Sequence, residues 1–477
     1  MEKFKRVLCV TLAGVMSCSV LGACGQKEVK ETKTITWLMP GDKQSDVQSV
    51  MDAVNKIIEP KLGINLELNI IDTGAYQEKM NLIMSAGEYY DMAFTGYVNK
   101  YLKAVDNEAL APLSELIEKE APELKEMIPD YMWEDATVNG EIYAVPNQQI
   151  VATQYAYMLQ KDLVEKYNFD YKSVTKSEDL EPFLKAVKEG EPDIYPYRTN
   201  YGVGMWTLPK YEKLTNMIYV PIDGDSTQAV VIRDTPEFQQ GINVLRDWFK
   251  KGYIRQDVEG SGDDSTLYKS GRFAVSGTTW KPGSEALVKA NLGEEYVYAK
   301  IGEPYVPNRA ACATMIGINK DCKYKSEVIK FISLLNSDKD LYNLLAYGIE
   351  GKHYTLTDDG KVKYIDNSGY SMKAAWKFGN QFNALLVDGD DENAYEDTKK
   401  MNDESKKSKL SGFYFDDSKV VNEISHMDAI TNYPYGIGTK DPSEYMDEMN
   451  ERYKAAGEDK VLAEIQGQID EFLKEKK

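Results

Sequence analysis

The stretch TITWLMPGD, residues 34–42, begins the pattern that decides the fold: a short apolar strand followed by a turn. Apolar residues then recur at helical spacing between Val47 and Ile58, and INLELNI (64–70) alternates as a strand does. A second helical segment, residues 75–86, leads into another strand, DMAFT (91–95). The order strand, helix, strand, helix, strand predicts a parallel sheet with right-handed crossovers.

Polar residues follow the first and third of these strands. Asp42 comes directly after the first strand, and Thr95 and Tyr97 stand at the end of the third. Ligands of open parallel sheets bind beyond the carboxyl ends of the strands, so we expect these three side chains to contact a ligand. Between the strands, Ser45 and Gln48 predict a capping box at the start of the first helix, and Pro60 and Gly63 predict its end.

The amino-terminal segment has the features of an exported protein. Lys3, Lys5 and Arg6 precede an apolar run, residues 7–20, that is too short to remain as a membrane-spanning helix. The tetrapeptide LGAC (21–24) resembles the lipobox of bacterial lipoproteins, which implies removal of residues 1–23 and attachment of lipid to Cys24. The alternative is an ordinary secretory signal with a chance cysteine. We expect a flexible tether at residues 24–33 and a lipid-anchored location at the extracellular face of the cell membrane.

Composition argues against several classes of function. The formal net charge is −20, so the chain repels nucleic acid. Two histidines are too few for a histidine-based metal or catalytic centre. The acidic run DGDDEN (388–393) has Asn393 and Lys399 where an EF-hand needs glycine and glutamate. No nucleotide-binding or hydrolase motif is present in the sequence, so we expect no metal, no cofactor and no catalysis.

Cys312 and Cys322 remain after removal of the signal segment. Cys312 lies in the strand-like run 310–318 and Cys322 follows a turn, which favours two small thiols that are buried or half-buried. An exported location would also permit a disulfide, so both alternatives stay open.

Several motifs occur in an order that resembles a known family. NGEIYAVP (139–146) is similar to the turn and strand dGkiYalP, and YKSGRFAV (268–275) is similar to the segment f..GkaAm. With Trp37, YDMAF (90–94) and the strand and helix at 313–336, they resemble the bacterial extracellular solute-binding proteins of the family-1 type, the receptors of ABC importers. The region from YGIEGKHY (347–354) onward resembles a lipoprotein subfamily whose C-terminal part has no assigned function.

The resemblance implies an α/β, two-lobed periplasmic-binding-protein fold with a ligand cleft between the lobes. Hinge crossings are expected near residues 150 and 309. Residues 34–150 and 311–350 would build lobe 1, and residues 153–307 and 355–477, including the C-terminal extension, would build lobe 2. A ligand that contacts both lobes would favour closure about the hinge.

Aromatic residues are the strongest indication of the ligand, with 33 Tyr and 6 Trp in the chain. Pyranose rings pack on aromatic planes, and their hydroxyls need amide or carboxylate partners. Trp206 and Trp280 lie in loops that contain glycine or polar residues, where a core tryptophan is less expected, whereas Trp248 is typical of a helix core. The other ligand candidates are Asn147, Gln148, Tyr155 and Arg309, for which hinge structure, core packing or pairing with an acid are the alternatives.

We therefore expect a monomeric, membrane-anchored receptor that captures a solute, first of all an oligosaccharide, and delivers it to the permease subunits of an ABC transporter. One alternative is a peptide or amino-acid receptor, which needs a charged clamp for the termini of its ligand. A surface glycosidase is the other alternative, and it needs two carboxylates held across a cleft. The spacing of residues selects neither of these features.

Overall fold

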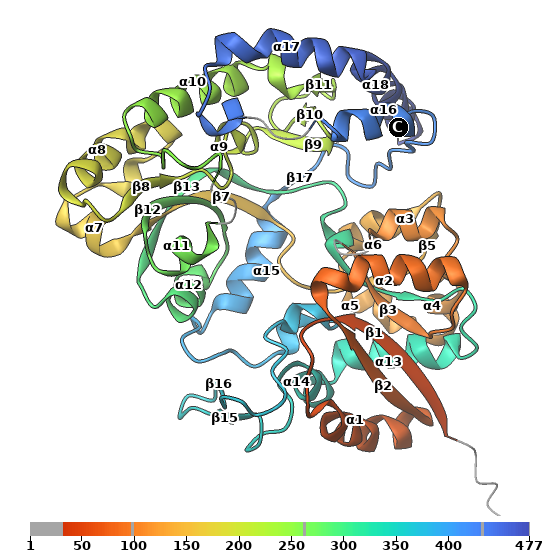
Figure 1. Cartoon of the computed structure of the whole chain (residues 1–477). Helices are drawn as coiled ribbons and strands as arrows, with labels where there is room; N and C mark the ends of the chain where they lie inside the picture. The colour runs from red at the N-terminus through yellow and green to blue at the C-terminus, as the bar shows by residue number, and fades with distance from the viewer. Residues whose placement is uncertain (1–31, 97–99, 261–263, 431–433, 477) are drawn as a thin grey trace, which may run out of the picture.

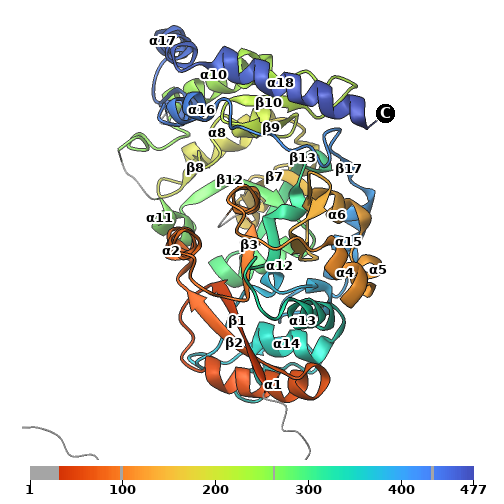
Figure 2. The same cartoon turned by 90° about the vertical axis from the view of Figure 1, so that its right-hand side faces the viewer.

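The computed structural model describes residues 32–96, 100–260, 264–430 and 434–476, and within them the chain is organised around two five-stranded sheets. In Figure 1 the sheet of lobe 1 lies at the lower right and that of lobe 2 at the upper left. Figure 2, turned by 90°, shows the two bodies one above the other. This is the two-lobed α/β arrangement that the sequence implied.

Lobe 1 is built on a sheet with the strand order β2-β1-β3-β14-β6. β1 pairs in parallel with β2 and β3, which confirms the sequence prediction, and β14 pairs antiparallel with β3 and β6. Its strands are β1 (Lys33–Pro40), β2 (Ile64–Ile71), β3 (Met92–Gly96), β6 (Ala144–Pro146) and β14 (Thr314–Ile318), beside the hairpin of β4 (Thr137–Val138) and β5 (Glu141–Ile142). Its helices are α1 (Val47–Leu62), α2 (Thr73–Ala86), α3 (Tyr101–Asp106), α4 (Ser114–Glu120), α5 (Glu123–Met127), α6 (Asp130–Ala136), α13 (Lys325–Ser337) and α14 (Lys339–Tyr347).

α1 begins without the predicted capping box. The residue before the helix is Asp46, and its side chain makes no bond to the helix backbone. Asp46 instead accepts hydrogen bonds from Lys352 and from Nε2 of His353 (2.8 Å), and the contact with Lys352 holds the pKa of Asp46 well below its usual range. Gly63 ends α1 at a φ of 69°, as predicted, whereas Pro60 lies inside the last turn. A tertiary contact thus replaces the expected local cap.

Lobe 2 is built on a sheet with the strand order β17-β13-β7-β12-β8, in which β7 is antiparallel to both of its neighbours. Trp248 is fully buried in the core of this lobe, as predicted. The strands are β7 (Thr153–Gln160), β8 (Tyr195–Arg198), β12 (Phe273–Trp280), β13 (Tyr296–Val306) and β17 (Lys406–Lys407). The helices are α7 (Lys161–Lys166), α8 (Glu181–Gly190), α9 (Gly204–Thr207), α10 (Pro236–Lys250), α11 (Ser265–Lys269) and α12 (Ser284–Leu292).

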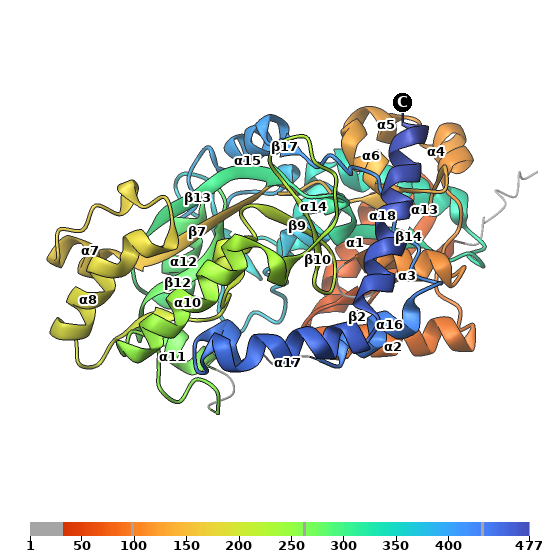
Figure 3. The same ribbon diagram turned by 90° about the horizontal axis from the view of Figure 1, so that it is seen from above.

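The C-terminal helices pack on a further core of lobe 2. This core joins a small antiparallel sheet, β9 (Tyr211–Thr215), β10 (Ile218–Pro221) and β11 (Val230–Val231), to α16 (Val421–Asp428), α17 (Pro442–Ala455) and α18 (Glu458–Glu475). Figure 3, seen from above, shows α18 turning away from the line of α17. A buried ion pair between Arg233 and Glu458, 2.8 Å long, fixes the start of α18 to the body of lobe 2. In the described parts of the chain, no helix is long and apolar enough to cross a membrane.

Among the described residues, three segments connect the two large sheets. The chain passes from β6 to β7 and from β13 to β14, which confirms the hinge crossings expected near residues 150 and 309. A third segment, α15 (Ala394–Glu404), leads into β17 and was not predicted. It is linked to the first crossing by Asn402, whose side chain is hydrogen bonded to the backbone of residues 149–152.

Residues 354–384 pack on lobe 1, whereas a boundary at 355 had been expected to place them in lobe 2. Tyr354, Val362, Tyr370 and Phe378 are all buried in the core of lobe 1. The hairpin of β15 (Tyr354–Leu356) and β16 (Val362–Tyr364) therefore belongs to this side of the molecule, as Figure 1 also shows. The cause is tertiary, because these residues bury their apolar side chains against α14 and the strands of lobe 1.

The segment before β14 also differs from the expected strand. Residues 310–313 form a 3-10 helix, and the strand begins only at Thr314. The turn starts at Arg309, which has a left-handed φ of 56°. Cys312 is half-buried, Cys322 is buried, and both are free thiols.

Candidate functional site

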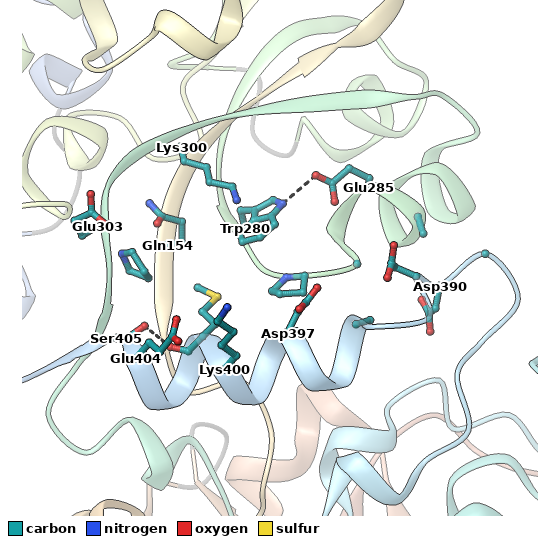
Figure 4. Close-up of a pocket in the computed structure, with 18 residues that line it drawn as sticks. Gln154, Trp280, Glu285, Lys300, Glu303, Asp390, Asp397, Lys400, Glu404 and Ser405 are labelled. Atoms are coloured by element: carbon teal, nitrogen blue, oxygen red, sulfur yellow. Dashed lines mark hydrogen bonds between the residues drawn. The ribbon is translucent and has the colours of Figure 1, made fainter.

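Three neighbouring cavities in the described structure surround residues 280–283, the turn that follows β12. The largest, about 830 Å³, lies between β12, β13, α12 and α15, and Figure 4 shows its lining. A second, about 520 Å³, lies between α12 and residues 347–398. A third, about 310 Å³, is lined by both of the predicted hinge crossings. A ligand at this turn would contact both lobes.

Trp280 stands between the largest cavity and the hinge cavity. Its Nε1 donates a hydrogen bond to Oε1 of Glu285 (3.0 Å), and Nζ of Lys300 lies 3.1 Å from the ring centroid (Figure 4). Burial lowers the pKa of Lys300. The structure therefore places Trp280 at a cavity wall, with an ammonium group over one face of its ring, and its contact with a ligand stays a prediction.

The lobe 1 wall of the second cavity contains Trp376, which was not predicted from the sequence. Trp376 is half-buried in the 3-10 helix Ala375–Lys377, and its ring lies edge-on to Phe94 of β3, with centroids 6.3 Å apart. Nζ of Lys377 donates to the backbone oxygen of Pro40 (2.7 Å), at the end of β1. Trp376 is thus held at the carboxyl ends of β1 and β3, where a ligand was expected. Its sequence signal, a tryptophan in a polar, glycine-containing loop, is the one that drew attention to Trp280.

The residues predicted from the strand ends have different environments. Asp42 is exposed after β1, and its charge partly opposes the burial that lowers the pKa of Lys377. Thr95 is 1% exposed within β3, and its buried hydroxyl has no hydrogen-bond partner among the described residues. Tyr97 lies outside the described residues.

Asn147 and Gln148 hold the first crossing to the segment that carries Trp376. Nδ2 of Asn147 donates to the backbone oxygen of Lys377 (2.9 Å), and the backbone N–H of Gln148 donates to the oxygen of Gly379 (2.7 Å). Both side chains are buried, and Oδ1 of Asn147 has no partner among the described residues. These contacts favour the structural alternative, in which the two residues support the hinge.

Trp206 does not line the cleft, so this prediction is wrong. Its side chain is 7% exposed and packs against Trp248 in the core of lobe 2, with ring centroids 5.7 Å apart. Gly241 of α10 allows this approach, because a Cβ there would lie 3.0 Å from Cγ of Trp206. Gly241 is distant from Trp206 in the sequence, so the residues of the loop around Trp206 do not indicate that this side chain is buried.

The guanidinium of Arg309 is hydrogen bonded within the protein. Its guanidinium donates to four backbone oxygens, those of Asp135, Thr137, Gly412 and Phe413. It therefore joins the second crossing to lobe 1 and to the chain that leads into the C-terminal helices. The neighbouring acid, Asp135, accepts the backbone N–H of Arg309 (3.0 Å), while the guanidinium is taken up by backbone carbonyls, which favours the structural alternative.

Tyr155 is half-buried in β7, and its ring lies edge-on to that of Tyr201, with centroids 6.4 Å apart. It lines a smaller cavity of about 170 Å³, on the other side of the lobe 2 sheet from Trp280. The structure therefore does not bring Tyr155 together with the two tryptophans.

The chain matches known proteins over most of its length. Residues 44–341 match the family described as "Bacterial extracellular solute-binding protein", and residues 409–474 match a domain of unknown function, DUF3502. A carbohydrate ABC transporter substrate-binding protein of Streptococcus pneumoniae is 30% identical, over 100% of each chain.

Solved structures with a similar fold include the N-glycan transport solute binding protein of Streptococcus pneumoniae. It has a TM-score of 0.82 and 29% identity, over 93% of this chain and 100% of that one. In complex with Man5GlcNAc the same protein gives a TM-score of 0.71 and 30% identity, over 93% and 99% of the two chains. By sequence match, fold and the position of its cavities between hinged lobes, this chain belongs to the bacterial extracellular solute-binding proteins.

Proposed function

We propose that the protein captures an oligosaccharide between its lobes and delivers it to the permease subunits of an ABC transporter. The observation that carries this proposal is the pair of tryptophans: Trp280 of lobe 2 and Trp376 of lobe 1 line neighbouring cavities at the interlobe turn. Flat aromatic faces suit the C–H faces of pyranose rings, and Trp residues are frequent binding hot spots. The printed descriptions of the relatives, a carbohydrate receptor and an N-glycan receptor, support the same class of ligand.

In this proposal the two lobes close about the crossings when the ligand binds. Contacts made from both lobes would shift the population toward a closed form. This chain has a TM-score of 0.82 to one structure of the relative and of 0.74 and 0.71 to those solved with Man1GlcNAc and Man5GlcNAc, a difference that is consistent with a different placing of the lobes. Closure would be measured as a smaller radius of gyration by small-angle scattering at saturation with ligand.

The family is extracellular, so the protein works outside the cytoplasm. The proposal adds that a monomeric chain is held at the membrane by lipid on Cys24, a residue outside the described part of the structure. Two acyl chains at this position would give durable anchoring. Cys24→Ser should abolish incorporation of labelled palmitate, and equal labelling of the variant would overturn the anchor.

The ligand class is tested by titration calorimetry against matched panels of oligosaccharides and peptides, with product analysis of the same incubations. Binding of at least one oligosaccharide, without cleavage, is the expected result. Binding of peptides alone would favour the alternative receptor function. Appearance of shorter sugars would favour a surface glycosidase and contradict a purely binding role.

A further inference from the structure

The 520 Å³ cavity is built largely by residues that lie between the two family matches, that is, within 342–408. One wall is aromatic, and the facing wall is α12 of lobe 2 with the turn before it. The aromatic residues are Tyr347, Tyr364, Trp376, Phe382 and Tyr395. The cavity therefore lies mostly outside the two family matches, beside Trp280.

The ammonium group of Lys281 is the most informative feature of this cavity. Lys281 is half-buried in the lining, and its side chain forms no hydrogen bond or ion pair with any residue that the structure describes. Its backbone is fixed, because its N–H donates to Oγ of Ser284 (2.9 Å) and its carbonyl accepts from the N–H of Ser284 (3.0 Å). Burial lowers the pKa of Lys281, because the charged form loses water contacts that no ion pair or hydrogen bond with a described residue replaces. A half-buried ammonium without a partner favours an anionic ligand.

The nearest acid does not satisfy Lys281. Asp390 raises the pKa of Lys281 through space but forms no ion pair with it in the described structure. Oδ2 of Asp390 accepts the N–H of Val387 (2.8 Å), so this carboxylate is used to hold its own loop. The cavity lining carries three lysines against two aspartates, on a chain whose net charge is −20. The excess of positive charge is therefore local to this cavity, and Lys281 is the lysine on the wall that faces the aromatic residues.

We propose that this cavity is a subsite for a sugar residue that bears a carboxylate, with its ring on the aromatic wall and its carboxylate on Lys281. The inference rests on the proposed capture of an oligosaccharide and names a chemical class for one of its residues. An ammonium–carboxylate contact adds selectivity that aromatic stacking alone does not supply, because stacking is insensitive to charge.

The test compares acidic oligosaccharides with neutral partners of the same shape. The probes are trigalacturonic acid with its methyl ester, and sialyllactose with its methyl ester, each titrated by calorimetry into the wild-type protein, Lys281→Met and Lys363→Met. Lys363 is an exposed lysine of the same cavity, so Lys363→Met is the matched control. We expect an acidic probe to bind about tenfold more tightly than its neutral partner, or about 1.4 kcal/mol. The ratio should fall to about one in Lys281→Met and persist in Lys363→Met.

The result of these titrations either supports the carboxylate subsite or overturns it. Equal binding of the acidic and neutral probes, or a preference that survives in Lys281→Met, would overturn the subsite and leave the receptor function standing. Failure of every oligosaccharide to bind would overturn both. Thermal melting checks the fold, and Lys281→Met should melt no lower than the wild-type protein, because it removes a half-buried charge without a partner.

Discussion

Replacement of Asn402 by leucine should loosen the first hinge crossing. Oδ1 of Asn402 accepts hydrogen bonds from the N–H groups of Val151 (2.9 Å) and Ala152 (3.1 Å), and Nδ2 donates to the oxygen of Gln149 (2.7 Å). Asn402 is 3% exposed, and Val151 and Ala152 are each 6% exposed, so water does not readily replace these bonds. One side chain from α15 thus satisfies three backbone groups of the crossing between the lobes.

The magnitude follows from the two buried N–H groups. Leucine has the same branched arrangement of side-chain heavy atoms as asparagine but accepts no hydrogen bond, and each buried donor left without a partner costs about 1–3 kcal/mol. The expected loss in local stability is therefore about 2–6 kcal/mol, with the loss at the half-exposed Gln149 carbonyl being smaller. Thr398→Val is the matched control: Thr398 lies one turn earlier in α15, is buried, and bonds only within its own helix, to the oxygen of Ala394 (2.6 Å).

Hydrogen exchange at residues 151 and 152 measures this effect directly, because it reports local opening and not only global unfolding. Asn402→Leu should raise the exchange rates of these two amides by at least about thirtyfold, the equivalent of about 2 kcal/mol. Thr398→Val should leave them close to the wild-type rates. Unchanged exchange at both amides in Asn402→Leu would refute the role assigned to this side chain.

Three further predictions concern the cavity wall, the C-terminal helices and the second crossing. Trp280→Ala and Trp376→Ala should each weaken oligosaccharide binding by about 1–3 kcal/mol, as measured by calorimetry. Trp206→Ala should instead destabilise lobe 2 by about 3–5 kcal/mol, as measured by urea unfolding. Normal oligosaccharide binding by both cavity variants would contradict the proposed site. Glu458→Gln leaves the buried charge of Arg233 without its partner, so urea unfolding should show a loss of about 3–5 kcal/mol, and a loss below about 1 kcal/mol would contradict the anchoring role. Burial raises the pKa of Asp135 from 3.8 to about 6, so the native state keeps a proton that the unfolded chain has released. We therefore compare the free energy of unfolding of the wild-type protein with that of Asp135→Asn. The difference between the two should fall by about 3 kcal/mol as pH rises from about 4 to about 6.5. A difference that stays constant over this pH range would contradict the raised pKa of Asp135.

Local pattern was sufficient for the strands and helices of lobe 1 that lie early in the chain. The alternation in residues 64–70 and the helical spacing between Val47 and Ile58 are short-range properties, and β2 and α1 follow them closely. Gly63 marked a helix end because glycine adopts a left-handed φ at little cost. The expected capping box of Ser45 and Gln48 is not formed, because α1 begins after Asp46 and the side chain of Gln48 donates to Asp52. Asp46 is held instead by Lys352 and His353, which are some 300 residues away in the chain.

The candidate site was predicted less completely than the fold. Trp280 and Trp206 carry the same local signal, yet one lines a cavity and the other packs on α10, where Gly241 leaves room for it. Trp376 was missed because its segment, expected in lobe 2, returns to the ends of β1 and β3 through Lys377. Arg309 stood beside the crossing as expected, but only the folded chain brings four carbonyl groups to its guanidinium.

The sequence by itself determined the order of the first strands and helices of lobe 1, because periodicity and turn residues are local in the chain. The two-lobed α/β fold and the positions of two crossings were implied by the resemblance of its motifs to a known family. Only the tertiary structure decided which aromatic side chains face a cavity and that residues 354–384 pack on lobe 1. It also decided that Asn402 of α15 is hydrogen bonded to the backbone of the first crossing. These features depend on burial and hydrogen bonding between segments that are hundreds of residues apart in the sequence. Such contacts form only when the whole chain folds, so a local sequence pattern does not predict them.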